Sequence, residues 1–308
     1  MVTINVIPSI GFSFGDPIKE LLRVWSEIIK NLHQAIVIDV SGCRFSNPFF
    51  LLGIYLLYRR YKQQGANIEL NTNCSNETFA AYLNLTYFLG GFQPDNYSAE
   101  EYDVILDSYM NKTYLPLTNF PSTALVQHTE VRERILEFMS QRVRQRLNLD
   151  IQLYTAVTYL IDEAVNNIKD HAQTERGFLF TQFYPKAEYM DLCIADAGIS
   201  ILGSYQAAGR LDITSHSQAI EAALNGESTK DVAGRGFGIR TSRNMLVNGL
   251  GGRYYLMSGD SFLFSYPGGN EEIKIFPNNS GLNWVGTYLA MRIPVQKNVN
   301  FHYNEYLE

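Results

Sequence analysis

The sequence predicts an α/β protein made of two domains. The chain has 308 residues, of which 46% are hydrophobic and 18% are charged, so it is long enough to bury two cores. β-branched runs of strand length alternate along it with amphipathic segments of helical period. The stretch "NKTYLPLTNFPSTA" contains two prolines and no clear periodicity, which is typical of a boundary. We therefore expect domains over residues 1–112 and 113–308.

Charge and cysteine usage exclude several classes of function. The formal net charge is -6, and no cluster of Lys and Arg forms a basic patch, so nucleic acid is not an expected partner. The three cysteines lack CxxC spacing, which argues against a disulfide framework or a zinc site and fits a reducing cytoplasm. The apolar run "PFFLLGIYLLY" is too short for a membrane span, and the start "MVTINVIPSIGF" lacks the basic region of an export signal. We expect a cytoplasmic protein.

The first region predicts a strand, a loop, a helix and a second strand. The segment "GDPIKELLRVWSEIIKNL" predicts a preceding helix with Asp16 as its N-cap and Pro17 as its first residue. "AIVIDVSG" has the composition of a buried strand. Asn47 is expected to cap a helix that opens at Pro48 and ends near Gly65, and "ANIELN" supplies the next strand. This order predicts a parallel pair of strands.

The stretch "IVIDVSGCRFSNPFFLLGIYLLYRRYKQQGANIEL" resembles the STAS fold of anti-sigma factor antagonists, over about residues 1–110. In that family an Asp-Ser-Ser-Gly stretch precedes the helix, and one serine is phosphorylated. Here that stretch is Asn47, Pro48, Phe49 and Phe50, so Phe49 occupies the phosphoserine position. The resemblance implies a STAS-like α/β domain without this switch, serving as a docking or dimerisation surface or persisting as a degenerate relic.

The segment "YLIDEAVNNIKDHA" predicts a helix with one apolar and one polar side. At about 100° per residue, one sector holds Leu160, Ile161, Ala164, Val165, Ile168 and Ala172. The other sector holds Glu163, Asn166, Asn167, Asp170 and His171. A solvated face would explain this pattern. Two adjacent asparagines are unfavourable inside a helix, however, and this favours a functional site.

Three further motifs follow in order. "MDLCIADAGISI" predicts a strand that ends at Asp196, with Gly198 two residues later. "GESTKDVAGRGFGIRTSRNML" places three alternating glycines before a helix, where backbone N–H groups bind anions well. "GTYLAMRIPV" offers Gly286 and Thr287 at the entry to a strand. Taken singly, an Asp-Gly turn and a flexible hinge explain the first two equally well.

Together these motifs resemble the GHKL ATP-binding fold of anti-sigma serine kinases, histidine kinases, gyrase-type topoisomerases, Hsp90 chaperones and mismatch-repair ATPases. "DEAVNNIKDHA" is similar to the N box, "DAG" to the adenine box, "GRGFGI" to the glycine-rich lid box and "GT" to the last box, within about residues 128–296. The N box is most similar to the anti-sigma kinase branch. The resemblance implies a Bergerat α/β sandwich, whose mixed sheet is covered by helices on one face. Ser200 departs from the adenine box, which often has a second glycine there.

The resemblance also implies roles for individual residues. Glu163 would be the general base, and Asn167 would bind Mg²⁺ through its amide oxygen. Asp196 would accept from the adenine amino group. The residues expected to bind the nucleotide are Asn166, Asp196, Gly198, Lys230, Gly234, Arg235, Gly236, Phe237, Gly238 and Thr287. A lid would extend over about residues 201–233.

The expected function is that of an ATP-binding regulatory protein, an anti-sigma-type serine/threonine kinase or ATPase in a signalling pathway. Its cofactors would be ATP and Mg²⁺, and its partner a STAS or sigma-factor-like regulatory protein; a homodimer is left open. The alternative is a nucleotide-operated protein-binding module with little or no catalysis. A sensor histidine kinase core is disfavoured, because no helical hairpin with an HE-type acceptor motif precedes the ATP-binding region.

Overall fold

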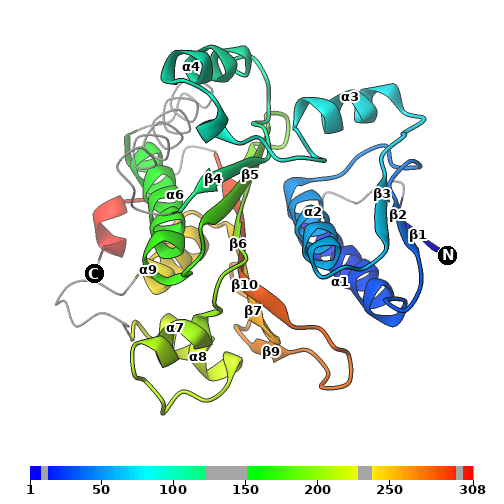
Figure 1. Cartoon of the computed structure of the whole chain (residues 1–308). Helices are drawn as coiled ribbons and strands as arrows, with labels where there is room; N and C mark the ends of the chain where they lie inside the picture. The colour runs from blue at the N-terminus through cyan, green and yellow to red at the C-terminus, as the bar shows by residue number, and fades with distance from the viewer. Residues whose placement is uncertain (8–12, 123–150, 228–237, 296–300, 308) are drawn as a thin grey trace.

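Two β-sheets of different type organise the chain (Figure 1). The computed structural model describes residues 1–7, 13–122, 151–227, 238–295 and 301–307. The smaller sheet is parallel and has the order β1-β2-β3, formed by β1 (Val2–Asn5), β2 (Ile36–Asp39) and β3 (Ile68–Asn71). The expected parallel pair, β2 with β3, is confirmed, and β1 adds a strand that the sequence interpretation missed.

The larger sheet has seven strands in the order β4-β5-β6-β10-β7-β8-β9. They are β4 (Thr118–Pro121), β5 (Arg176–Tyr184), β6 (Tyr189–Asp196), β7 (Arg253–Gly259), β8 (Ser261–Ser265), β9 (Ile273–Ile275) and β10 (Trp284–Pro294). Every neighbouring pair is antiparallel, so the expectation of a mixed sheet is wrong. Short connections reverse the chain between β5 and β6 and between β7 and β8, and β10 enters between β6 and β7 against the direction of both.

The helices α1 (Gly15–Lys30) and α2 (Pro48–Gln63) follow the sequence closely, with one correction at a cap. Asn47 caps α2 as expected, because its side-chain oxygen accepts a hydrogen bond from the backbone N–H of Phe50. Pro48 is the first helical residue. Asp16 is not a cap: α1 begins one residue before it and has no side-chain cap hydrogen bond. The proline at position 17 still lies in the first turn, where its missing N–H costs nothing.

Helix α2 is buried on almost every side. Its buried residues are Pro48, Phe49, Phe50, Leu51, Leu52, Gly53, Ile54, Tyr55, Leu56, Leu57 and Tyr61. A helix that is apolar all round needs apolar neighbours on all sides. Figure 1 shows why: α1 and α2 lie between the small sheet and the large sheet, and all of these elements contribute to one hydrophobic core. No helix among the described residues is both long and apolar enough to cross a membrane.

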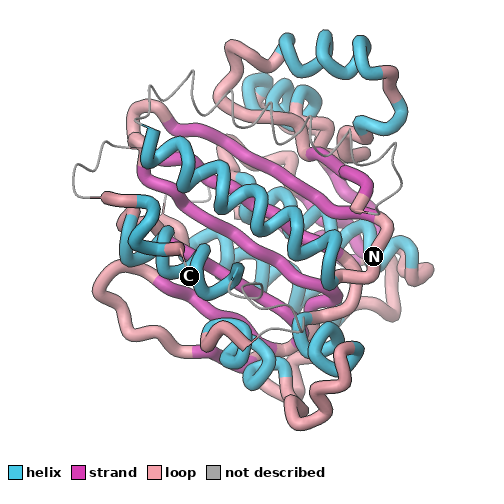
Figure 2. The backbone as a smooth tube through the Cα atoms, turned by 90° about the vertical axis from the view of Figure 1, so that its left-hand side faces the viewer, coloured by secondary structure: helices cyan, strands magenta, loops and turns pink. Residues whose placement is uncertain are grey.

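Both faces of the large sheet are covered, because side chains on its central strands alternate between two cores. On β6, Leu192 and Ile194 belong to one core and Cys193 and Ala195 to the other. The first core is formed with α6 (Ile151–His171), which lies across the sheet in Figure 2. The second core is formed with α1 and α2. Helices of the C-terminal region therefore cover one face, as expected, while the N-terminal region covers the other.

The remaining elements are short. They are α3 (Glu77–Leu85), the 3₁₀ turn η1 (Pro94–Asn96), α4 (Ala99–Ser108), α7 (Ile201–Ala207), α8 (His216–Leu224), α9 (Gly238–Asn244), the π-helical turn η2 (Met245–Gly249) and the 3₁₀ turn η3 (Tyr303–Tyr306). Helices α7, α8 and α9 lie on the same side of the large sheet as α6 (Figure 1). The helical spacing of Val131, Ile135, Phe138, Met139 and Val143 in "EVRERILEFMSQRVRQRL" predicts a further helix, and this segment lies outside the described residues.

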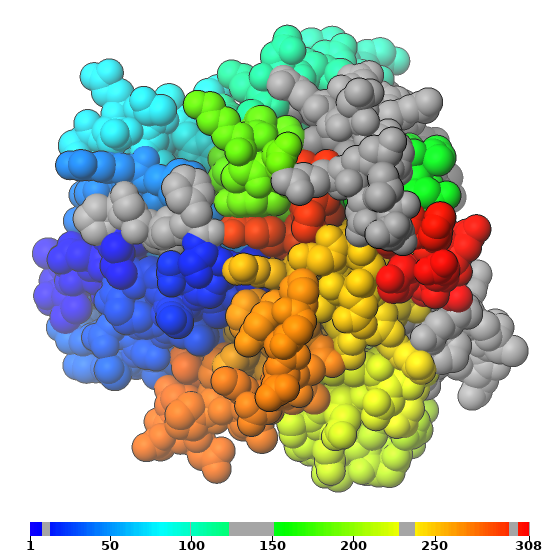
Figure 3. All heavy atoms as spheres, turned by 180° about the vertical axis from the view of Figure 1, so that it is seen from behind, coloured from blue at the N-terminus to red at the C-terminus, as the bar shows by residue number. Residues whose placement is uncertain are grey.

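The N-terminal region and the large sheet meet through aromatic rings and one long-range hydrogen bond. The hydroxyl of Tyr288 on β10 donates to the backbone carbonyl of Phe49 at the start of α2. The ring of Phe14 stacks on Phe264 of β8, with centroids 5.4 Å apart. The space-filling view shows N-terminal residues (blue) directly against residues of β7 and β8 (yellow to orange) (Figure 3).

A buried ion pair lies beneath this contact. The guanidinium of Arg292 binds the carboxylate of Asp191 with two hydrogen bonds of 2.7 and 2.8 Å. The same guanidinium lies 4.0 Å from the ring centroid of Tyr189, and 5.7 and 5.8 Å from those of Phe14 and Phe49. Rings of the N-terminal region therefore help to shield a charge pair that belongs to the large sheet.

The residue that the STAS resemblance aligns with a phosphoserine, Phe49, is buried. Phe49 is 1% exposed, and its ring packs edge to face on Phe14 with centroids 4.7 Å apart. The nearby Ser46 is likewise 1% exposed. A phosphate group carries close to two negative charges and needs solvent or cationic partners. The beginning of α2 is therefore packed against the sheet and leaves no solvent around these residues for a phosphate group.

Removing residues 1–112 should expose one face of the large sheet to solvent. The uncovered side chains would be Phe178, Phe180, Cys193, Ala195, Tyr255, Met257, Tyr288 and Ala290. A patch of this kind favours association. We expect the fragment 113–308 to bind a hydrophobic dye and to aggregate, whereas the full chain stays monodisperse in light scattering. A fragment that is monomeric and melts cooperatively at the temperature of the full chain would contradict this expectation.

Candidate functional site

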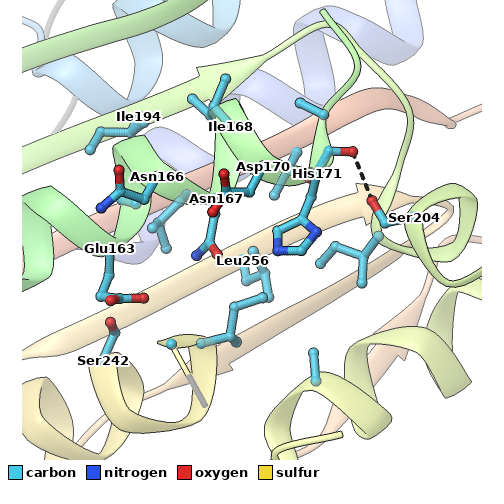
Figure 4. Close-up of a pocket in the computed structure, with 18 of the residues that line it drawn as sticks. Glu163, Asn166, Asn167, Ile168, Asp170, His171, Ile194, Ser204, Ser242 and Leu256 are labelled. Carbon is cyan, nitrogen blue, oxygen red and sulfur yellow. Dashed lines mark hydrogen bonds between the residues drawn. The ribbon is translucent and has the colours of Figure 1, made fainter. Parts of the chain in front are cut away.

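A cavity of about 670 Å³ lies on the α6 side of the large sheet, and it brings together the sequence motifs. Its walls come from α6, from the end of β6 with the turn that follows, from α9, and from β7 and β10. The expected site residues that line it are Glu163, Asn166, Asn167, Asp196, Gly238 and Thr287. Ten of the residues that line it are labelled in Figure 4.

The two sides of α6 behave as the sequence predicts. The apolar sector is buried, with Leu160 at 0% and Ile161 at 1% exposed. The polar sector lines the cavity, where Figure 4 shows Glu163, Asn166 and Asn167 on one side of the helix. The asparagines are therefore part of a cavity wall, while Asp170 of the same sector is exposed.

Asp196 ends β6, as expected, and its carboxylate is already engaged by the backbone. One oxygen accepts a hydrogen bond of 2.9 Å from the N–H of Gly198, and the other accepts a hydrogen bond of 3.2 Å from the N–H of Thr287. Asp196 is 3% exposed, and this burial raises its pKa to about 7, against the opposing effect of the two N–H donors. Each oxygen has a further lone pair, so the carboxylate can still accept from a ligand.

Gly198 approaches α6 so closely that no other residue would fit. A side-chain carbon at this position would overlap the carbonyl oxygen of Ala172. The next residue, Ile199, donates its N–H to the same carbonyl at 2.8 Å. Ser200, where the resemblance expects a glycine, caps α7 by accepting from the N–H of Gly203 at 3.2 Å. The turn after Asp196 is therefore tied to the end of α6.

The Gly286–Thr287 pair lies inside strand β10, which corrects the expectation that it stands at the entry to a strand. The pairing register with β7 shifts between Trp284 and Thr287, and Gly286 has a φ of 79°. A side-chain carbon on Gly286 would overlap Asp196. Ser258 of β7 holds this bulge, because its hydroxyl donates to the carbonyl of Gly286 at 3.0 Å. The sequence interpretation missed Ser258, since only its register opposite Thr287 reveals the role.

Helix α9 presents Gly238 directly to the carboxylate of Glu163. A side-chain carbon on Gly238 would overlap Oε2 of Glu163 and would lie 3.8 Å from Nδ2 of Asn167. In Figure 4 the side-chain oxygen of Ser242 points toward the same carboxylate. The sequence interpretation missed Ser242, although it stands one helical turn after the last glycine of the motif.

Apolar side chains line the cavity near Asp196. They are Ile168, Ile194, Ile199, Ile201, Leu256 and Leu289. A cavity of this volume with apolar walls and a few convergent polar groups is typical of a small-molecule site. Its polar lining includes the buried carboxylate of Asp196 and the polar sector of α6.

Several expected site residues cannot be compared with this geometry. Lys230, Gly234, Arg235, Gly236 and Phe237 lie outside the described residues. Of the expected lid, the described part includes α7 and α8.

The donor set can be tested against the expected magnesium ion. Within the described ranges, no group of three or more His, Cys, Asp or Glu side chains could hold a metal. Mg²⁺ on a nucleotide needs only one or two protein oxygens, because phosphates and water supply the others. The amide oxygen of Asn167, which lines the cavity, fits that smaller requirement.

The raised pKa of Asp196 predicts a pH-dependent effect on stability. Between about pH 4 and pH 7 the folded chain keeps a proton on this carboxyl that the unfolded chain has released. Its stabilising contribution is therefore present below about pH 4 and lost as the pH rises through about 7. Asp196→Asn stays neutral throughout. The melting temperature of the wild-type chain should fall relative to that of Asp196→Asn between about pH 4 and 7.

Calorimetric melts of both proteins across this range would measure the difference. Asp191, whose pKa burial raises to about 6, titrates in both proteins and cancels in the comparison. A constant difference in melting temperature would contradict the prediction.

Comparison of the chain with protein-family models, curated proteins and solved structures found no match.

Proposed function

We propose that this chain is an ATP-binding regulatory protein with a GHKL-type site, which transfers the terminal phosphoryl group to a serine or threonine of a partner protein or to water. One observation supports this most. Residues from three separate motifs, Glu163 with Asn167, Asp196, and Thr287, line a single cavity, and Gly238 of the fourth motif lines it too. The order of these motifs along the chain does not by itself require their side chains to converge.

The Asp196 end of the cavity suits a purine. Asp196 offers free lone pairs to an exocyclic amino group, and flanking apolar side chains such as Ile194 and Leu256 suit a flat ring. Gly286 lies directly against Asp196, and Gly198 lies against the carbonyl of Ala172, so neither position accommodates a side chain. In this proposal Asp196 selects adenine by accepting a hydrogen bond from its amino group.

The Glu163 end of the cavity suits the phosphates. Asn167 would hold Mg²⁺ through its amide oxygen, and the ion would neutralise phosphate charge when bound. Glu163 stands one turn away on the same helix and would accept the proton of the attacking hydroxyl. Gly238, at the start of α9, leaves room beside that carboxylate. The incoming hydroxyl belongs to a STAS or sigma-factor-like regulatory protein in this proposal.

A second candidate is a nucleotide-operated binding module with little catalysis, and one contact favours it. Thr287 lines the cavity, while the next residue, Tyr288, points to the opposite face and donates to Phe49. A nucleotide that contacts Thr287 would therefore contact the strand on which the N-terminal region is packed. Nucleotide binding could then alter the surface that this region offers to a partner.

Two substitutions on α6 separate the proposed roles. Asn167→Ala should abolish the tightening of ATP binding by Mg²⁺, because the ion loses its protein ligand. Glu163→Ala should still bind Mg-ATP, while turnover falls about 10²- to 10⁴-fold because the base is lost. Titration calorimetry with and without Mg²⁺ measures the first effect. Labelled ATP, with the chain alone and with lysate, measures phosphate release and phosphoprotein formation.

Thr155→Ala is a matched control, because Thr155 lies on the same helix and its hydroxyl bonds the carbonyl of Ile151 away from the cavity. It should change neither binding nor turnover. Binding of Mg-ATP without turnover in the wild-type chain would favour the binding module over the kinase. Failure of the wild-type chain to bind ATP at all would refute both.

A further inference from the structure

Ser258 of β7 forms hydrogen bonds with two separate segments that flank Asp196. Its hydroxyl oxygen accepts a hydrogen bond of 3.0 Å from the N–H of Ile201, the first residue of α7. The same hydroxyl donates a hydrogen bond of 3.0 Å to the carbonyl of Gly286, in the bulge of β10. Ser258 is 0% exposed. One buried side chain therefore joins the turn after Asp196 to the bulge.

The same two segments hold the carboxylate of Asp196. The N–H of Gly198 in the turn donates to one carboxylate oxygen, and the N–H of Thr287 in the bulge donates to the other. A side-chain carbon on Gly286 would overlap both the backbone oxygen and Oδ1 of Asp196, so the bulge and the carboxylate are in direct contact. The turn, the carboxylate, the bulge and the Ser258 hydroxyl thus form a closed ring of hydrogen bonds. In this ring Ser258 links the turn to the bulge independently of the carboxylate.

We propose that Ser258 is a positioning residue that determines base selectivity, because its hydroxyl fixes the turn against the bulge and so aims the free lone pairs of Asp196 at an amino group of a purine. This inference rests on the proposed function, in which Asp196 accepts a hydrogen bond from adenine. A site rejects a ligand that lacks a hydrogen-bonding group only if the matching protein group is held in place. Ser258 is fully buried, so it acts on a ligand through the groups that it holds.

Base selectivity tests the proposal. Titration calorimetry compares ATP with purine riboside triphosphate, which carries hydrogen in place of the amino group. Measurements are made at about pH 8, above the pKa of Asp196, which burial raises to about 7. The wild-type chain should prefer ATP about 10- to 100-fold, the effect of one hydrogen bond to a charged acceptor.

Substitution of Ser258 should reduce this preference. In Ser258→Ala the preference for ATP should fall about tenfold, because the turn and the bulge lose their link and the acceptor is displaced. Ser258→Thr keeps the hydroxyl and should restore the preference. If Ser258→Ala does not melt cooperatively, Ser258→Cys takes its place, because a thiol is close to a hydroxyl in size but is only a weak hydrogen-bond donor.

Ser261→Ala is the matched control. Ser261 pairs with Ser258 across β7 and β8 and is also 0% exposed, but its hydroxyl donates to the carboxylate of Asp260 at 2.8 Å. Its loss should leave the base preference unchanged. The tightening of ATP binding by Mg²⁺, which the proposed function assigns to Asn167, should be the same in all of these variants.

A second measurement needs no nucleotide. Amide hydrogen exchange at Gly198 and Thr287, followed by NMR in the ligand-free chain, reports the two hydrogen bonds to Asp196. Exchange at both amides should be about tenfold faster in Ser258→Ala than in the wild-type chain. Ser258→Thr and Ser261→Ala should exchange at the wild-type rate.

The outcomes separate this inference from the proposed function. Unchanged exchange at Gly198 and Thr287 in Ser258→Ala, or a base preference equal to that of wild type, would overturn the role of Ser258. So would a wild-type chain that binds both nucleotides equally well. A wild-type chain that binds no ATP, although exchange is faster in Ser258→Ala, would instead overturn the proposed function.

Discussion

The burial of helix α2 between two sheets is the constraint on which the rest of the structure depends. This helix presents Phe49, Phe50 and Leu51 in succession, and all three are at most 1% exposed. Truncating one fully buried Phe typically costs about 3–5 kcal/mol, whereas a whole domain is stable by only about 5–15 kcal/mol. The small sheet covers one side of α2 and the large sheet covers the other. Neither sheet can release the helix without exposing more apolar surface than the fold can tolerate.

This arrangement places the N-terminal region directly behind the cavity. Strand β10 forms both surfaces, because its side chains alternate between the two cores. Thr287 meets Asp196 on the cavity side, and Tyr288 meets the beginning of α2 on the other. Arg292, on the same strand, carries its ion pair with Asp191 beneath the rings of Phe14 and Phe49. A single strand therefore connects the cavity with the N-terminal region.

Patterns among neighbouring residues made much of the fold predictable from the sequence. The cap at Asn47, the parallel pair of strands, the division of α6 into two sectors and the strand that ends at Asp196 all depend on neighbouring residues, which the sequence displays. Features that depend on distant residues were missed or misread. The sheet is antiparallel throughout its described pairs, and Gly286 lies in a bulge, because both depend on how β10 enters between β6 and β7.

The candidate site shows the same division. Glu163 and Asn167 stand out in the sequence because polar residues are unusual inside a helix. Ser242 and Ser258 are ordinary serines in the sequence, and only their positions opposite Glu163 and Gly286 distinguish them. The docking of α2 on the large sheet had one sequence signal, the apolar run that is too long for a helix with one buried side. Nothing in the sequence indicated which surface would cover it.

The sequence separation between Phe49 and Tyr288 has a consequence for biosynthesis. These residues are 239 positions apart, and β10, whose Tyr288 bonds the beginning of α2, is almost the last element of the described chain. At about 5–20 residues per second, a ribosome needs roughly 10–50 s to extend the chain from one to the other. During that time β5 and β6, which also pack against α2, are made first, and the cover of α2 on this side stays incomplete until β10 is added. Nascent chains of this protein are therefore suited to recognition by a chaperone that binds apolar helices, until β10 emerges and completes the second core.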